Sequence, residues 1–153
     1  ERLMLALAAV GLGVAEEALR RAADYTSQRM QFGTPLSSFQ SSAHRAADGY
    51  IDVEAMRATL WQAAWLLDEG GDPAEASAAV LVAGWWAGDG AQRVTHGVQH
   101  LHGGLGADVE YPVHRYFLWA KQLELALGSP NTDLARLGAL IADRARAAEE
   151  ALR

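Results

Sequence analysis

The sequence has 153 residues, none of them cysteine, and no long apolar run. Without cysteine, disulfide scaffolds, thiolate metal sites and cysteine nucleophiles are excluded. Even an apolar-rich uncharged stretch such as Ala76 to Gly88 has only 13 residues, whereas a membrane span needs roughly 20 apolar ones. Basic residues are also few: 13 Lys and Arg face 19 Asp and Glu, which gives a net charge of -6. Such a chain has no overall basic field, so neither nucleic acid nor a membrane is an expected partner.

What the sequence does contain is typical of a folded globular domain. Half of the residues are hydrophobic and 21% are charged, and this length suffices to bury a core. We expect one domain over residues 1–153. The chain opens at Glu1 in mid-pattern, without an initiator methionine or a leader segment, which leads us to expect a piece of a longer polypeptide, located in the cytoplasm.

Helical periodicity runs through most of the chain, and no alternating strand pattern of useful length occurs. Five helices are predicted: Arg2 to Gln31, Phe39 to Glu69, Pro73 to Leu101, Pro112 to Leu127 and Thr132 to Leu152. A loop is expected from Phe32 to Ser38, and an extended segment from Ala107 to Tyr111. Gly70, Asp72 and Pro73 have the residue types of a helix terminator, an N-cap and a first helical position. The expected fold class is all-α, an antiparallel four-helix bundle.

The apolar residues predict which face of each helix is buried. Two stripes on the first helix, one with Leu3 and Val10 and one with Leu5 and Leu12, predict that its first half is nearly surrounded. The expected seam of the second helix is Ala46, Tyr50, Val53, Leu60, Ala64 and Leu67, interrupted by Arg57. The expected seam of the third is Val80, Gly84, Ala87, Ala91, Val94, Val98 and Leu101.

Two local patterns have chemical potential but no unique meaning. His96 and His100 are four residues apart on a helix, yet no carboxylate or cysteine completes a ligand set, so no metal is expected. The run His102-Gly103-Gly104-Leu105-Gly106 lacks the strand of a dinucleotide-binding fingerprint and the Gly-Lys-Ser/Thr of a phosphate-binding loop. It is either a helix terminus or a set of uncovered backbone N–H groups suited to a phosphate or cofactor.

Three separated motifs resemble the acyl-CoA dehydrogenase family. The first is Arg29-Met30-Gln31-Phe32-Gly33 with Gln40 eleven residues after the arginine. The second is His102-Gly103-Gly104-Leu105-Gly106 running into Glu110-Tyr111-Pro112-Val113-His114-Arg115. The third is Gly128-Ser129 near the last helix, where the family usually has Gly-Thr. The resemblance covers essentially the whole chain and corresponds to the family's C-terminal helical domain.

The resemblance implies a bundle that pairs with another subunit, with FAD at the place where subunits meet. Arg29 would contact the FAD pyrophosphate, and Phe32 and Gln40 the adenosine part. Further residues would follow the dinucleotide: His100, Leu101, His102, Gly103, Gly104, Ser129 and Asn131. The family commonly has glutamine three residues before the first glycine, whereas this chain has His100 there and Gln99 one place earlier, so both are candidates. From the residues alone, Arg29 is also interpretable as a solvated cation at a helix end.

The reaction implied by the resemblance is α,β-desaturation of an acyl-CoA thioester, which requires a carboxylate base. Most members place this glutamate immediately before the Gly-Thr pair, where the present chain has Leu127. A minority, including isovaleryl- and long-chain acyl-CoA dehydrogenases, has it in a Glu-Arg-Leu sequence that Glu1-Arg2-Leu3 resembles. We therefore expect Glu1 to be the base, with Arg2 and Gly128 near the acyl-CoA. The alternative is that Glu1 is a carboxylate favoured by the helix dipole.

Other departures concern the substrate and the partners. Ala126 stands where many relatives have a bulky aromatic residue, which favours a bulky or branched acyl group. Leu118 and Trp119 replace the usual Arg-Asp, and this region resembles actinobacterial members linked to steroid side-chain degradation, some of which pair two different subunits. Expected partners are the N-terminal and middle domains of the same enzyme and a homo- or hetero-oligomer, and the piece alone should be inactive. An acyl-CoA oxidase and a non-catalytic helical oligomerisation module remain the alternatives.

Overall fold

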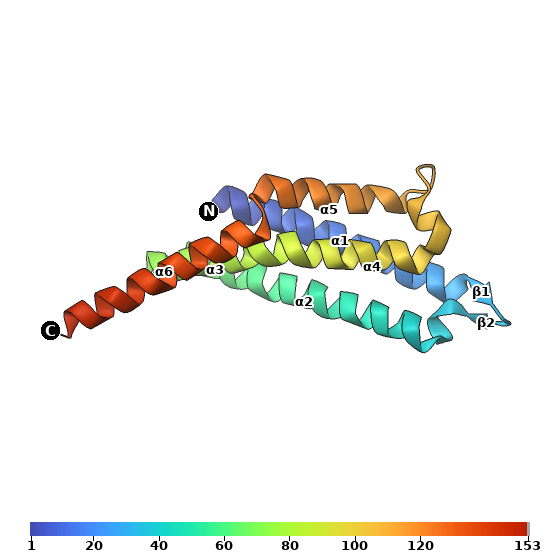
Figure 1. Ribbon diagram of the computed structural model, residues 1–153, viewed down its shortest axis with the longest axis horizontal. Helices are drawn as coiled ribbons and strands as arrows, with labels where there is room; N and C mark the ends of the chain where they lie inside the picture. The colour runs from blue at the N-terminus through green and yellow to red at the C-terminus, as the bar shows by residue number, and fades with distance from the viewer. Residues whose placement is uncertain (153) are drawn as a thin grey trace.

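The structure, a computed structural model, describes residues 1–152, so Arg153 of the expected domain lies outside the described residues. Its main helices are α1 (Arg2–Gln28), α2 (Gln40–Glu69), α3 (Pro73–Trp85), α4 (Ala91–His102), α5 (Val113–Leu127) and α6 (Pro130–Ala151). A π-helical segment, η2 (Trp86–Gly90), joins α3 to α4. Figure 1 shows α1, α2, the α3–α4 unit and α5 side by side in alternating directions, with α6 projecting beyond them. The predicted all-α four-helix fold is confirmed.

The core lies along the seam of α3, η2 and α4. All seven residues predicted for this seam, from Val80 to Leu101, are buried. Small side chains let the helices approach closely, since a Cβ atom placed on Gly11 of α1 would lie 3.6 Å from that of Ala87. The largest cluster of buried side chains joins α1, α2, α4 and α5. Apolar burial of this kind is the main source of the bundle's stability.

The turn between α2 and α3 has the predicted chemistry. Gly70 ends α2 in the left-handed conformation, with φ at 67°. The Asp72 carboxylate accepts a hydrogen bond from the backbone N–H of Ala74, at 2.9 Å, and Pro73 occupies the first turn of α3. These three residues satisfy the helix ends in the ways expected from their types.

The first helix ends earlier than predicted, because residues 29–35 form a small hairpin. Strands β1 (Met30–Gln31) and β2 (Thr34–Pro35) pair antiparallel, and a 3₁₀ turn, η1 (Leu36–Ser38), follows. The backbone N–H of Leu36 donates to the Arg29 carbonyl at 2.8 Å, which draws Arg29 into extended conformation. The prediction of helix to Gln31 and loop from Phe32 was therefore wrong at this boundary. Two strands of two residues leave the fold class unchanged.

Further helix boundaries also differ from the prediction. The third helix is interrupted by the π-helical η2 and ends at His102, and the last helix starts at Pro130. The segment predicted to be extended, Ala107 to Tyr111, is not. Its first residue, Ala107, ends a 3₁₀ turn, η3 (Gly103–Ala107). The chain then bends because the Asp108 carboxylate accepts from the backbone N–H of Glu110 at 2.9 Å. An aspartate of this kind competes with extended structure by bonding its own backbone.

Some residues predicted to be buried are exposed in this chain. Tyr50 is 60% exposed, and Leu3 and Val10 on α1 are 74% and 47% exposed. The buried residues of α2 are Val53, which was predicted, and Gly49, Met56 and Ala63, which were not. No helix within residues 1–152 has both the length and the apolar character needed to cross a membrane.

Candidate functional site

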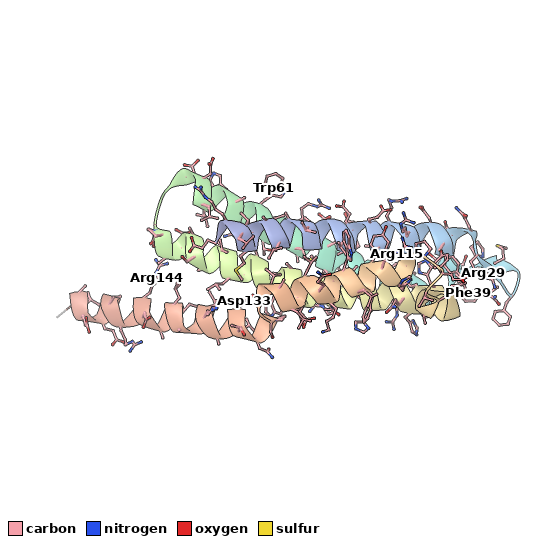
Figure 2. All side chains as sticks on the ribbon, turned by 90° about the horizontal axis from the view of Figure 1, so that it is seen from above. Arg29, Phe39, Trp61, Arg115, Asp133 and Arg144 are labelled. Atoms are coloured by element: carbon pink, nitrogen blue, oxygen red, sulfur yellow. The ribbon has the colours of Figure 1, made fainter. Side chains whose placement is uncertain are left out.

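A cavity of about 420 Å³ opens where the end of α4 meets the hairpin that follows α1. Arg29 lines it from one side, and His100, Leu101, His102, Gly103 and Gly104 line it from the other. The structure thus brings together six residues predicted to contact the cofactor. The other lining residues are Tyr25, Gln31, Leu36, Ser41, Ser42 and Arg45. Figure 2 shows Arg29 beside Phe39 at this end of the bundle.

The lining of this cavity is cationic although the chain as a whole is acidic. Arg29 and Arg45 both line it, and no carboxylate does. Neither arginine forms an ion pair with a residue in the described part of the chain, 1–152. A guanidinium group binds phosphate oxygens through paired hydrogen bonds. The cavity is therefore suited to an anion such as a pyrophosphate. Sequence reasoning missed Arg45, which sits on the exposed side of a helix in no recognisable motif.

The three glycines of the His102-Gly103-Gly104-Leu105-Gly106 run are glycine for different structural reasons. Gly103 has φ at 60° and ψ at −136°, a conformation that other residues rarely adopt. A Cβ atom on Gly106 would lie 2.9 Å from two backbone atoms of Gln99 and closer still to its carbonyl oxygen. Gly104 has neither constraint, because a Cβ atom there would meet nothing within 4 Å. Its glycine is not required by the packing of this chain, which is consistent with close approach by a ligand.

His102 is a neutral residue in the wall of the cavity. It is buried, and its ring stacks on Tyr25 with centroids 4.5 Å apart. Burial lowers the pKa of His102, and a hydrogen bond to the Val98 carbonyl opposes this effect. Since a carbonyl only accepts, Nδ1 carries the proton at 2.8 Å from Val98, and Nε2 is left as a buried acceptor without a partner within residues 1–152.

The structure separates the two residues that were candidates for facing the cofactor. The Gln99 amide donates to the Gly106 carbonyl at 3.0 Å, and this bond closes the turn after α4. His100 is exposed and lines the cavity. Of the two, His100 thus lines the cavity, and Gln99 stabilises the turn.

Phe32 and Gln40 lie at the same end of the bundle but do not line this cavity. Phe32 is 94% exposed at the tip of the hairpin, where its ring meets that of Phe39 edge to face, with centroids 6.4 Å apart. Gln40 is exposed in the first turn of α2. Both side chains are available to a ligand that extends outward from the cavity.

The remaining predicted residues lie at the opposite end of the bundle. Glu1 is exposed at the N-cap of α1, where its carboxylate accepts a hydrogen bond from the Ser77 hydroxyl. Arg2 is exposed and lines a separate groove of about 450 Å³ between α1 and α2. Leu127 is buried against Ala8 and Ala87.

The connection from α5 to α6 brings three more predicted residues to this second end. Gly128 and Ser129 both have positive φ, 96° and 78°. Positive φ is uncommon for a residue with a side chain and costs of order 1 kcal/mol. Ser129 is half-buried at the N-cap of α6, and Asn131 is exposed in its first turn.

One chain therefore carries its predicted site residues in two groups. At 1.5 Å per residue, the 27 residues of α1 separate Glu1 from Arg29 by about 40 Å. A single extended dinucleotide cannot contact both ends. Within residues 1–152, no three His, Asp or Glu side chains gather in a way that could hold a metal ion.

Comparison with known proteins identifies the fold and the family. The family model described as acyl-CoA dehydrogenase, C-terminal domain, matches residues 1–142. Acyl-CoA dehydrogenase FadE27 of Mycobacterium tuberculosis is 46% identical over 144 residues, which cover 91% of this chain and 39% of that protein. The short-chain-specific acyl-CoA dehydrogenase of Megasphaera elsdenii is 39% identical and is covered over 33% of its length. The chain thus spans about two fifths or less of the length of these relatives.

Solved structures agree with this assignment. The Tcur3481–Tcur3483 steroid ACAD superposes with a TM-score of 0.88 at 53% identity, covering 94% of this chain and 39% of that chain. The ChsE4–ChsE5 complex from Mycobacterium tuberculosis gives a TM-score of 0.85 at 48% identity, with 91% and 37% coverage. The chain belongs to the acyl-CoA dehydrogenase family and corresponds to its C-terminal domain.

Proposed function

We propose that this chain is the C-terminal domain of an FAD-dependent acyl-CoA dehydrogenase that introduces an α,β double bond into an acyl-CoA thioester. The observation that supports this most is the cation-lined cavity, which joins Arg29 to the segment from His100 to Gly104 in an otherwise acidic chain. The family relationship supports the same reading.

The residues of the cavity fit an FAD pyrophosphate. Arg29, with Arg45 beside it, supplies guanidinium donors for the phosphate oxygens. Gly104 leaves room for a ligand to approach the backbone, and Nε2 of His102 offers a buried acceptor to a hydroxyl or amino group. Phe32 and Gln40 would contact the adenosine part outside the cavity. When bound, the flavin accepts the hydride that leaves the substrate.

In this proposal Glu1 is the base that takes the proton next to the thioester carbonyl, with Arg2 and Gly128 beside the acyl-CoA. Glu1 is exposed here and held by Ser77. The preceding domains would have to cover Glu1 and desolvate it, which would make it more basic. Because Glu1 and Arg29 are about 40 Å apart, the two ends of α1 would serve two different flavins, Ser129 and Asn131 belonging to the one near Glu1.

We also propose that the full protein works in an assembly. Two of the similar structures bear the names of two proteins each, Tcur3481–Tcur3483 and ChsE4–ChsE5, so a heteromer is the favoured form over a homo-oligomer. The first of these is named a steroid ACAD, and a bulky polycyclic or branched acyl group is accordingly the proposed substrate class. The cytoplasm remains the proposed compartment.

The second candidate is a subunit that binds a partner without supplying the base. Leu127, which cannot take a proton, occupies the position where most of the family has its glutamate, and Glu1 is engaged by Ser77. In that case the flavin site would draw its base from a different chain. An acyl-CoA oxidase, which differs in passing electrons to oxygen, is a third reading with the same domain.

The deciding experiment uses the full-length parent purified with any co-encoded partner. A panel of acyl-CoA thioesters is added without oxygen, and bleaching of the flavin absorbance is recorded for the wild type and for Glu1→Gln. Loss of the base should reduce the bleaching rate at least a hundredfold while FAD stays bound, in line with the effect of general bases. Glu75→Gln, an exposed carboxylate on α3, is the matched control and should bleach normally.

Each outcome separates the candidates. Unchanged bleaching in Glu1→Gln would place the base elsewhere and favour the partner-subunit reading. Absence of both flavin and bleaching in the wild-type assembly would contradict the enzyme proposal. Rapid reoxidation of the bleached flavin on admission of air would identify an oxidase.

A further inference from the structure

Helix α6 is attached to the bundle by an unusual residue. Asp133 is 1% exposed. Among the 22 residues of α6, Pro130–Ala151, it is the one that is buried. The helix packs on α3 and on η2. Figure 2 shows Asp133 near the start of α6, with Arg144 farther along the same helix. A helix would ordinarily present apolar side chains to its neighbour at such a position.

The Asp133 carboxyl group lies over Gly84 of α3. A Cβ atom on Gly84 would be 3.1 Å from Oδ2 of Asp133 and would collide with the terminal methyl of Met4. Neither Oδ1 nor Oδ2 has a hydrogen-bond partner among residues 1–152. An ionised carboxylate in this position would lose its hydration without compensation.

The charged groups on the neighbouring elements are engaged elsewhere or exposed. Glu1 accepts from Ser77, Asp89 pairs with Arg93, Glu124 pairs with Lys121 at 2.6 Å, and Asp72 pairs with Arg144 at 2.9 Å. Arg2 and Glu75, near the start of α1 and of α3, are exposed. On α6 itself, Arg136 attracts the negative charge, yet burial has the larger effect and raises the pKa of Asp133.

We propose that Asp133 is held inside the bundle as an uncharged carboxylic acid, and that its ionisation releases the first turns of α6 from α3. An acid with a raised pKa stabilises the docked helix at low pH. This stabilisation is lost as pH rises from the ordinary range of an aspartate through the pKa of the docked state. A charged Asp133 regains water only if the start of α6 moves away.

The position of Asp133 gives this release a consequence for the site. The turn that moves carries Ser129 and Asn131 and follows Gly128, which has a left-handed backbone suited to a hinge. If these residues contact the dinucleotide, which rests on the proposed function, rising pH would also weaken the cofactor contacts at this end. The release of α6 itself does not depend on that assignment.

Hydrogen exchange followed by mass spectrometry on the full-length protein tests the proposal, from about pH 5 to about pH 9 with rates corrected for intrinsic exchange. Protection of residues 130–141 should fall with pH in the wild type, by up to tenfold per pH unit for one proton. Asp133→Asn and Asp133→Leu, which cannot ionise, should show flat profiles with higher protection above neutral pH. Asp143→Asn, an exposed carboxylate on the same helix, should keep the wild-type slope.

A flat wild-type profile, or the same slope in both Asp133 variants, would overturn the proposal. FAD dissociation is measured in parallel. If exchange depends on Asp133 while FAD release does not, the α6 proposal stands and the cofactor role of Ser129 and Asn131 fails. If FAD does not bind at all, the exchange result still decides the question of Asp133.

Discussion

At the scale of single residues, Phe32 combines two costs that the fold does not require. It is 94% exposed, and its φ of 50° places a large side chain in the left-handed region. With Gly33 at φ 80°, it forms the two-residue turn of a hairpin, where both central residues have positive φ and Asn-Gly is favoured. A residue such as asparagine would stabilise this hairpin better than phenylalanine does. We therefore infer that Phe32 is covered by a ligand or by another part of the assembly.

We therefore predict opposite effects of Phe32→Asn on stability and on cofactor binding. Asparagine tolerates the left-handed conformation, so the thermal midpoint of the apoprotein should stay the same or rise, by an amount equivalent to about 1 kcal/mol at most. Loss of an aromatic surface for the adenine should weaken FAD binding by about 5- to 100-fold, the range for base stacking. Isothermal titration of the full-length apoprotein with FAD measures this.

The matched control for that prediction is Val109→Asn. Val109 is 75% exposed and apolar but lies outside the cavity, so its substitution should leave FAD affinity unchanged. Equal affinities of the wild type and Phe32→Asn would show that the aromatic ring does not contact the cofactor.

At the scale of elements, the buried seam of the third predicted helix was predictable, whereas those of the first two helices were predictable only in part and several boundaries were not. Every residue of the seam from Val80 to Leu101 is buried because apolar spacing of three and four residues carries continuously along α3 and α4. Because this spacing continues without a break through η2, it does not predict the π-helical turn there. On α2, Tyr50 was placed in the core by its apolar ring and lies outside, because apolarity alone does not tell a core face from an interface.

In the candidate site, too, some residues were predictable from the sequence and others were not. The family motifs located Arg29 and the glycine run, and the structure brings these into one cavity. Arg45 lies outside every motif and was found only through its position. The hairpin at residues 30–35 depends on a bond between Leu36 and Arg29 that no periodicity encodes. Asp133 in a first helical turn looks ordinary in sequence, because acidic residues are common there.

The turn after α4 allows a prediction from two glycines of one motif. Gly106→Ala should destabilise the protein, because the new Cβ would press on the backbone of Gln99, and we expect a cost of about 1–3 kcal/mol. Gly104→Ala meets open space in this chain and should change stability by about 0.5 kcal/mol at most. If a ligand approaches the backbone here, Gly104→Ala should nevertheless weaken FAD binding at least about tenfold, or 1.4 kcal/mol.

The thermal midpoint and the FAD affinity are measured for both variants, Gly106→Ala and Gly104→Ala. Gly71→Ala, another glycine with open space around it but far from the cavity in a connecting turn, is the control and should alter neither quantity greatly. A Gly104→Ala protein with normal FAD affinity would contradict the placement of the dinucleotide along this turn.

At the scale of the whole molecule, the described chain exposes many large apolar side chains. Large apolar side chains are exposed on α1 and α2, namely Leu3, Val10, Tyr50, Ile51, Trp61 and Trp65, and on α5, namely Leu118, Trp119 and Leu125. Large exposed apolar side chains mark contact regions where they gather into a patch. The relatives are more than twice as long as the matched segment, so they possess the additional mass needed to cover these faces.

The exposed tryptophans allow a direct test of whether these apolar faces are covered in the full-length assembly. Trp61, Trp65 and Trp119 are 68%, 60% and 58% exposed in the domain, and Figure 2 shows Trp61 projecting from the bundle. In the full-length assembly, hydroxyl-radical labelling read by mass spectrometry should modify Trp61 and Trp65 several-fold more slowly than the unfolded protein, because burial of an indole removes a large apolar area from water. If both are labelled as fast as in the unfolded protein, the α1–α2 face stays open to solvent. Trp119 reports separately on α5, so protection of Trp61 and Trp65 without Trp119 would assign the contact to the α1–α2 side and leave α5 as a free face of the assembly.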